Sequence, residues 1–121
     1  MYPTDEALMQ AIIDRRDAQA FAVLYDRWSA RMYRYFLRMM NRQAAKAADL
    51  TQDLFLKIIE KPHLFDPSRR FSTWLYTLAA NQCKNEFRRK KLIEQVENYP
   101  DTIGHDAALH LPESLDRMLL E

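Results

Sequence analysis

Glycine is nearly absent from this 121-residue sequence, which contains a single one at position 104. An average chain of this length would hold about eight. One glycine cannot build a glycine-rich phosphate loop, a dinucleotide-binding fingerprint or a series of two-residue hairpins. The scarcity therefore argues against nucleotide-binding α/β folds and against all-β folds.

Cysteine is represented by Cys83 alone, so neither an intramolecular disulfide nor a cysteine-based zinc site can form. No run approaches the roughly 18 apolar residues of a membrane span. Residues 1–10 also lack the basic start and apolar run of a secretory leader. We therefore expect one cytoplasmic domain that is not inserted in a membrane, with Cys83 as a small apolar core residue and with no cofactor.

Charge is present in both signs but is distributed unevenly, although the formal net charge is only +1. Residues 21–45 carry a net +4 and residues 62–91 a net +5, whereas residues 1–20 carry −2 and residues 92–121 carry −6. A basic body followed by an acidic tail is typical of a protein with a polyanionic partner. Ordinary solvated helix faces are the alternative explanation.

Apolar residues recur at helical spacing through most of the chain, and no strand pattern is found. The pattern predicts helices over residues 5–15, about 18–40, about 43–61 and about 71–97. Thr4 and Asp17 are suited to cap the first two helices. Pro62 and Pro67 predict a loop over residues 63–70, because proline cannot continue a helix interior. The fold class is therefore all-α, a compact bundle of about four helices in residues 1–97, followed by an acidic linker over residues 98–121 in which Pro112 could start a short amphipathic helix.

The apolar positions of each helix predict its core-facing side. In the first helix these are Leu8, Ile12 and Ile13, and in the third they are Ala47, Leu50, Leu54, Phe55 and Ile58. The second helix has a wide stripe that comprises Phe21, Leu24, Tyr25, Trp28, Met32, Tyr35, Phe36, Met39 and Met40. Its opposite face collects Arg27, Arg31, Arg34, Arg38 and Arg42. In the fourth helix, Trp74, Leu75, Leu78, Cys83 and Phe87 supply the buried side.

The fourth predicted helix also carries a polar face that becomes basic toward its end. The residues that share this face, at spacings of three or four, are Thr73, Thr77, Asn81, Lys84, Arg88 and Lys91. Hydroxyl and amide groups bond base edges or phosphates, and Lys and Arg neutralise phosphates. Trp74 and Tyr76 lie close by and could stack on an exposed base. The helix thus predicts a nucleic-acid surface, the alternative being a solvated basic end that the helix dipole favours.

Four sequence segments occur in an order that resembles a known family. They are FAVLYDRW at 21–28, DLTQDLFLKII at 49–59, FDPSRRFSTWLYTLAAN at 65–81 and RRKK at 88–91. Together they resemble region 2 of the sigma-70 family, in its extracytoplasmic-function (ECF) group of bacterial RNA polymerase sigma factors, over roughly residues 17–95. The resemblance implies a non-enzymatic transcription initiation factor that binds core RNA polymerase and recognises and melts the minus-ten promoter element.

The resemblance also implies a polymerase-binding helix. In the family, the helix that matches residues 49–59 docks on a coiled coil of the largest polymerase subunit. The implied polymerase-binding residues are Asp49, Gln52, Asp53, Leu54 and Phe55. Two of these carboxylates, at i and i+4, could instead form a weak metal pair with His63 or Asp66, but the helix lacks a third spaced ligand.

In the family, the loop that matches residues 65–71 and the helix after it bind the minus-ten element, and the loop receives a base flipped from the non-template strand. Flipping costs a few kcal/mol, which a shaped pocket must offset. Trp74 matches an aromatic wedge at the upstream edge of the bubble, and Leu75 replaces the second aromatic of housekeeping members, which predicts a need for a near-consensus promoter. With the polar helix face, the candidate DNA-binding residues are Asp66, Ser68, Arg69, Arg70, Thr73, Trp74, Tyr76, Thr77, Asn81, Lys84 and Arg88.

Family members normally have a second helical domain that reads the minus-35 element. This sequence ends at Glu121 after what resembles the start of an interdomain linker, so we expect polymerase binding but poor initiation. The tail contains Leu111, Leu115, Leu119 and Leu120, which favours an alternative function as a sigma-like interaction module that an anti-sigma factor binds and regulates. A further hypothesis is that the acidic tail competes with DNA for the basic surface.

Overall fold

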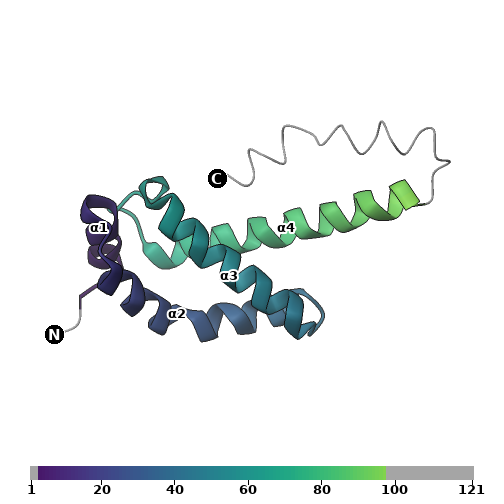
Figure 1. Cartoon of the computed structure of the whole chain (residues 1–121), viewed down its shortest axis with the longest axis horizontal. Coiled ribbons are helices and arrows are strands. Elements are labelled where there is room, and N and C mark those ends of the chain that lie inside the picture. The colour runs from purple at the N-terminus through teal and green to yellow at the C-terminus, as the bar shows by residue number, and fades with distance from the viewer. Residues whose placement is uncertain (1–2, 98–121) are drawn as a thin grey trace. The chain divides into compact units, whose positions relative to one another are not determined.

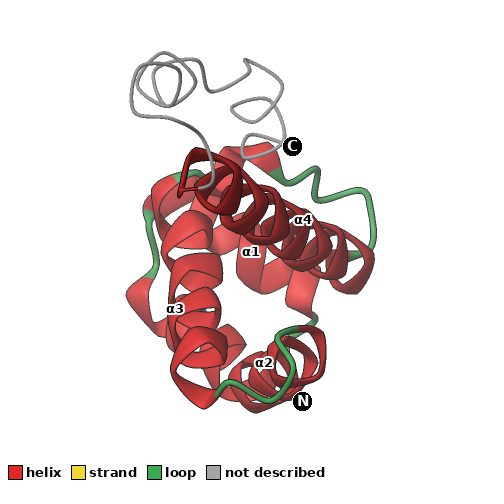
Figure 2. Ribbon diagram, turned by 90° about the vertical axis from the view of Figure 1, so that its right-hand side faces the viewer, coloured by secondary structure: helices red, strands yellow, loops and turns green. Residues whose placement is uncertain are grey.

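The computed structural model describes residues 3–97, and every regular element in this range is a helix (Figure 2). The elements are α1 (Asp5–Arg15), α2 (Ala18–Met39), α3 (Ala44–Glu60), the short 3₁₀ helix η1 (Pro62–Leu64) and α4 (Phe71–Glu97). The all-α prediction and the helix ranges are confirmed to within a residue or two. The predicted loop over residues 63–70 was wrong at its start, because Pro62 presets the backbone for the 3₁₀ turn of η1. The acidic linker and its short helix lie outside the described residues.

The described residues fall into two compact units, residues 3–79 and residues 80–97, and the boundary lies within α4. The first unit contains α1, α2, α3, η1 and the first turns of α4. In this unit α3 returns alongside α2, and α1 packs on α2 (Figure 1). The domain boundary expected after residue 97 stays a prediction. No helix in residues 3–97 combines the length and apolar character needed to cross a membrane.

The predicted N-cap residues Thr4 and Asp17 cap the first two helices. The Thr4 hydroxyl accepts a hydrogen bond from the Ala7 N–H at 3.1 Å. One carboxylate oxygen of Asp17 accepts from the N–H groups of Gln19 at 3.0 Å and Ala20 at 3.1 Å. The bond from Ala20, followed by that from Gln19 and the nearby Arg15 charge, holds the pKa of Asp17 below its ordinary value. Both capping predictions are confirmed.

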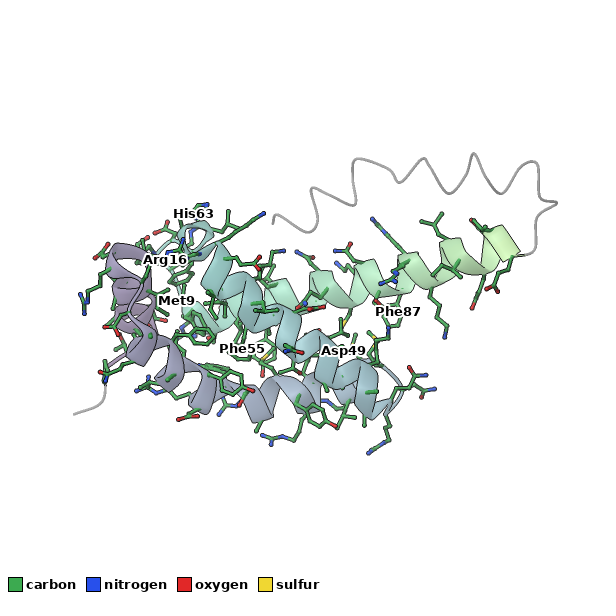
Figure 3. All side chains as sticks on the ribbon, in the orientation of Figure 1. Met9, Arg16, Asp49, Phe55, His63 and Phe87 are labelled. Carbon is green, nitrogen blue, oxygen red and sulfur yellow. The ribbon has the colours of Figure 1, made fainter. Side chains whose placement is uncertain are left out.

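The scarcity of glycine has a visible consequence at the helix ends. Left-handed backbone, which usually favours glycine, is adopted by Arg16 with φ 53°, Asn41 with φ 56° and Arg42 with φ 62°. Arg16 ends α1 and also reaches the last turn of α3, where its guanidinium Nη1 donates to the Ile59 carbonyl at 2.8 Å. Figure 3 shows Arg16 beside the turn that holds His63. Because this position holds Arg16 and not a glycine, its side chain links the end of α1 to the end of α3.

The buried stripe of α2 is narrower than the sequence pattern predicts. Its buried members are Leu24, Trp28, Met32, Phe36 and Met40, at steps of four, with Ala20 one turn earlier. The side chains of Tyr25 and Met39 are 44% and 40% exposed, and Phe21 and Tyr35 are half-buried. The prediction was too wide because helical spacing locates an apolar face but not the width that neighbouring helices cover.

The other helices bury most of their predicted residues. All five predicted positions of α3 are buried, and α1 buries Leu8 and Ile12 while Ile13 is only half-buried. Met9, which the pattern did not select, is fully buried (Figure 3). In α4, Leu75, Leu78 and Cys83 are buried. Trp74 is half-buried and Phe87 is 47% exposed, so the prediction that Phe87 lies on the buried side was wrong.

Burial makes Cys83 a source of pH-dependent stability. Its side chain is 1% exposed, and burial, with a smaller contribution from the Glu86 charge, raises the pKa of the thiol from 9.0 to about 11. An unfolded thiol ionises near pH 9, while the folded one stays protonated to about pH 11. The folded state then binds more protons, so its stability falls with rising pH in this window.

We expect the free energy of unfolding of the wild type to decline between about pH 9 and 11 relative to a Cys83→Ala variant. Urea unfolding followed by circular dichroism at several pH values from 8 to about 11 measures both proteins. The variant serves as the control for all other groups that titrate in this range. Parallel stability curves for the two proteins would contradict the assignment.

Candidate functional site

A short turn after η1 places four of the candidate DNA-binding residues. The Asp66 carbonyl accepts from the Arg69 N–H at 2.9 Å across Pro67 and Ser68, which closes a β-turn. Asp66 Oδ1 also accepts from the Ser68 N–H at 3.0 Å and from the Ser68 hydroxyl at 2.7 Å. Aspartate at the first position and proline at the second are favoured in such turns. The sequence DPSR thus folds locally into a well-defined loop.

These hydrogen bonds divide the loop residues into two groups. The Ser68 hydroxyl, then the Ser68 N–H and the Arg69 charge, hold the pKa of Asp66 below its ordinary value. Asp66 therefore stays ionised near neutral pH, and together with Ser68 it maintains the turn. Arg69 is 82% exposed, with its Nε 3.8 Å from the Asp66 carboxylate, and Arg70 is also exposed. The two arginines are the loop's exposed cations, and one of them, Arg69, pairs with the exposed Asp66 carboxylate.

An aromatic cluster anchors the loop at both ends. Phe65, just before the turn, is 2% exposed, and its ring centroid lies 5.8 Å from that of Phe71 and 5.0 Å from that of Trp74. Phe71 also packs edge-on against Trp28 of α2 at 5.9 Å. Trp74 remains half-buried, so part of its ring is accessible next to the loop. The loop arginines and Trp74 are consequently held on one rigid support.

A long-range hydrogen bond fixes the first turn of α4. The Phe71 N–H donates to the Glu6 carboxylate at 2.8 Å, although these residues are 65 positions apart in the sequence. The beginning of a helix has free N–H groups and a partial positive charge, both of which a carboxylate satisfies. Glu6 therefore positions α4 and the loop from α1. The sequence analysis missed this role, since no local pattern pairs the two residues.

Within the first unit, α4 carries three further candidate residues. Thr73 and Thr77 are exposed, and the Thr77 hydroxyl donates to the Thr73 carbonyl at 2.8 Å, which leaves its lone pairs open to a donor. Tyr76 is half-buried and packs edge-on against Trp28 at 6.2 Å and Tyr35 at 5.6 Å. Two rings also contact Trp74, and both side chains are half-buried, so each can offer a base only part of its ring.

The second unit carries the remaining candidates on the later turns of α4. Asn81 is half-buried, whereas Lys84 and Arg88 are exposed. Three more exposed cations follow, namely Arg89, Lys90 and Lys91. This part of the helix is strongly electropositive, which suits neutralisation of phosphates.

The α3 candidates divide between surface and core. Asp49, Gln52 and Asp53 are exposed, as the resemblance requires of docking residues. Leu54 is fully buried and Phe55 is 3% exposed, with its ring 4.9 Å from Tyr25 on α2 (Figure 3). In this arrangement Leu54 supports α3 from the core, whereas Phe55 is largely covered but lines the groove between α2 and α3. Their part in polymerase binding stays a prediction. The metal alternative has no support among residues 3–97, where no cluster of three or more suitable side chains occurs.

An apolar groove of about 570 Å³ runs between α2 and α3 beside these carboxylates. Its lining includes Phe21, Tyr25, Gln52, Leu56 and Ile59. The sequence analysis placed Tyr25 in the core and did not select Leu56 or Ile59. A signal was present, because Gln52, Leu56 and Ile59 follow helical spacing along a second face of α3, outside its core stripe. Two exposed apolar residues on such a face are typical of an interaction surface.

Comparison with known proteins decides the family. The sequence model of Sigma-70 region 2 matches residues 24–93, which include most of α2, all of α3, the loop and most of α4. The chain belongs to the sigma-70 region 2 family. The carboxylates, the loop and the basic turns of α4 therefore lie within region 2, as does the groove apart from Phe21.

The relatives of this region 2 chain are named as sigma factors. It is 37% identical over 86 residues to the ECF RNA polymerase sigma factor RpoE of Cereibacter sphaeroides, a match that covers 70% of this chain and 47% of the relative. It is 33% identical over 79 residues to the ECF RNA polymerase sigma factor SigW of Bacillus subtilis, with 65% and 42% covered. The predicted resemblance to the ECF group is thus confirmed. The chain spans about half the length of the curated relatives it matches.

A solved structure has the same fold as this region 2 chain. The crystal structure of Rhodobacter sphaeroides SigE in complex with the anti-sigma ChrR matches with a TM-score of 0.59 and 24% sequence identity. The match covers 96% of this chain and 92% of the other chain. This likeness supports the fold prediction independently of sequence motifs.

Proposed function

We propose that this chain is the part of an ECF-type sigma factor that binds core RNA polymerase and the non-template strand of the minus-ten promoter element. It acts in the cytoplasm and catalyses no reaction itself. The observation that carries the proposal is the loop at residues 65–70, where a closed turn leaves Arg69 and Arg70 exposed and the half-buried Trp74 follows in the first turn of α4. A positively charged loop next to an aromatic ring is the arrangement that single-stranded DNA binding requires.

The mechanism follows from the separate tasks of these residues. Asp66 and Ser68 keep the loop shaped, so little ordering entropy is lost when a flipped base enters beside it. Trp74 stacks at the edge of the melted segment, which is worth about 1–3 kcal/mol per base. Thr73, Thr77 and Asn81 offer polar groups to bases, while Lys84 and Arg88 neutralise the backbone. Strand separation is thereby favoured because the protein binds the unpaired strand more tightly than the duplex.

Polymerase binding is assigned to the exposed side of α3. Asp49 and Asp53 present negative charge at the edge of the apolar groove, so a basic helical partner with an apolar stripe fits both features. The coiled coil of the largest polymerase subunit is the partner that the family resemblance implies.

Substitutions on the later turns of α4 test the proposed binding to single-stranded DNA. We expect Lys84→Ala and Asn81→Ala each to weaken binding to a single-stranded minus-ten oligonucleotide, and Lys84→Ala to lower the salt slope by about 0.7. Asn81→Ala is expected to reduce affinity without changing that slope, since an amide carries no charge. Fluorescence titration at several salt concentrations measures both effects.

Phe87→Ala is a suitable control on the same helix, because its side chain is exposed and uncharged. If the wild-type chain shows no affinity for any minus-ten oligonucleotide, even with core polymerase present, the DNA-binding function is wrong.

A second candidate function is capture by an anti-sigma factor. The structural relative SigE was crystallised in complex with the anti-sigma ChrR, and the groove between α2 and α3 offers apolar side chains that a helix could cover. An anti-sigma factor that covered this groove would also block the carboxylates assigned to polymerase. Co-purification from the native host followed by competition with core polymerase distinguishes regulation of this kind from a chain that binds polymerase alone.

A further inference from the structure

A second pocket lies on α2, and its lining is dominated by arginine. It has a volume of about 500 Å³ and is lined by Arg31, Arg34, Leu37, Arg38, Arg42 and Tyr76. All of these residues belong to the first unit. We propose that this arginine pocket binds the sugar-phosphate backbone of double-stranded DNA next to the minus-ten element. The inference rests on the proposed function and adds a second DNA contact to the one on the loop and α4.

The positive charge of the pocket is not balanced locally. Arg27, one turn earlier on α2, forms an ion pair with Asp5 at 3.0 Å and is half-buried. In the part of the chain that the structure describes, no such ion pair joins Arg31, Arg34, Arg38 or Arg42 to a carboxylate. All four are exposed. Four uncompensated cations around one hollow attract a polyanion strongly.

Interaction with the helix dipole does not explain why these arginines lie along α2. Cations at the end of a helix are stabilised by its partial negative charge, but this effect falls off within the last turn. Arg38 lies in the last turn of α2 and benefits from it. Arg31 and Arg34 lie one to two turns earlier, so their positions need another reason. Within α2, Arg31, Arg34 and Arg38 form a row about 10 Å long at the 1.5 Å rise of a helix, and Arg42 follows beyond the helix end. This row matches an extended charged partner.

One of the arginines, Arg31, is already oriented. The Arg31 guanidinium carbon lies 4.7 Å from the centroid of the Trp28 ring, a cation–π contact that restricts the side chain. The backbone N–H of Arg42 donates to the Leu37 carbonyl at 2.7 Å, which fixes the course of the backbone just beyond α2. Less side-chain entropy is lost on binding when the groups are held in advance.

The lining of the pocket favours duplex over single-stranded DNA, because it combines four arginines with one half-buried ring, that of Tyr76. Single-strand sites combine cations with exposed aromatic rings. Here Trp28 is buried beneath Arg31, and Tyr76 is packed between Trp28 and Tyr35. A strand whose bases stay stacked in a duplex presents only phosphates, and phosphates are what the arginines contact. Tyr76 lines this pocket from α4, the helix proposed to bind the melted strand, so the two surfaces are adjacent within the first unit.

Salt-dependent binding of the full 121-residue chain tests the pocket. The probes are a short duplex without a minus-ten sequence and a single-stranded minus-ten oligonucleotide, each titrated between about 50 and 200 mM salt. The double variant Arg34→Gln, Arg38→Gln is expected to lower the duplex salt slope by about 1.8 and the duplex affinity at low salt by more than about tenfold. Binding to the single strand is expected to stay within about twofold of the wild type.

Arg15→Gln is the matched control, since it removes one exposed positive charge on α1, away from the pocket lining. The proposal is wrong if the double variant has the same duplex salt slope as the wild type. It is also wrong if the double variant loses no more duplex affinity than Arg15→Gln does. An equal loss on both probes also overturns it, because the occupant would then be single-stranded. A wild-type chain that binds duplex through these arginines but not the minus-ten strand would instead refute the proposed function and leave the pocket standing.

Discussion

Replacing Asp53 by lysine is expected to remove binding to the polymerase coiled coil, with a loss of affinity of at least about 30-fold. Truncating one partner of a buried charge pair at an interface costs about 2–5 kcal/mol, and reversal adds repulsion. Asp53 is exposed on the α3 side assigned to docking and lies near the apolar groove that contains Gln52 and Leu56. Pull-down of the chain by the isolated coiled coil, followed by a binding titration, measures the effect.

Two further variants make this prediction sharper. Asp49→Lys, one turn earlier on the same exposed side of α3, is expected to act in the same direction. Asp26→Lys makes the same charge change on α2, at an exposed position outside the groove lining, and is expected to retain binding. Thermal unfolding of each variant separates loss of contact from loss of fold. Full retention of the Asp53 and Asp49 variants by the coiled coil would exclude α3 as the docking helix.

Phe71→Ala is expected to lower the free energy of unfolding by about 3–5 kcal/mol. The Phe71 ring is fully buried and contacts the rings of Trp28, Phe65 and Trp74, with centroids 5.8 to 5.9 Å away. Its removal leaves a cavity next to Phe65 and at the start of α4. A domain of this size loses about 4–8 °C of melting temperature per kcal/mol, so the expected shift exceeds about 12 °C.

The chain supplies its own control for this substitution. Phe87→Ala removes the same atoms from the same helix, but the Phe87 side chain is 47% exposed, so a change within about 0.5 kcal/mol is expected (Figure 3). Urea unfolding followed by circular dichroism compares the two. Because the cluster supports Arg69, Arg70 and Trp74, binding of the minus-ten oligonucleotide is expected to decline with Phe71→Ala under conditions where the variant is still folded. Similar stabilities for both variants would contradict the anchoring role.

Local physics explains why much of the fold was accessible from the sequence. Thr4 and Asp17 cap their helices through hydrogen bonds that span two or three residues, and Pro67 with Asp66 closes the loop in the same way. Interactions of this range depend on neighbouring residues alone, so they are visible as short patterns. The same holds for the α3 core stripe, whose five positions are all buried.

The exposed carboxylates and the loop arginines were also identified from the sequence, because charged residues outside an apolar stripe are expected at the surface. The sequence could not show how far Phe55 is covered. Its burial depends on the Tyr25 and Phe21 rings of α2, which lie 4.9 and 6.3 Å away.

The sequence by itself determined an all-helical chain, its helix limits, a loop around Pro67 and membership in a family, all of which follow from local spacing and residue order. It also showed that nearly absent glycine excludes phosphate loops. Only the tertiary structure decided which side chains are covered, that Glu6 caps α4 from 65 residues away, and that Arg34 and Arg38 share a pocket with Tyr76. The physical reason is that burial and long-range hydrogen bonds depend on which helices meet, and periodicity along one helix contains no information about its neighbour.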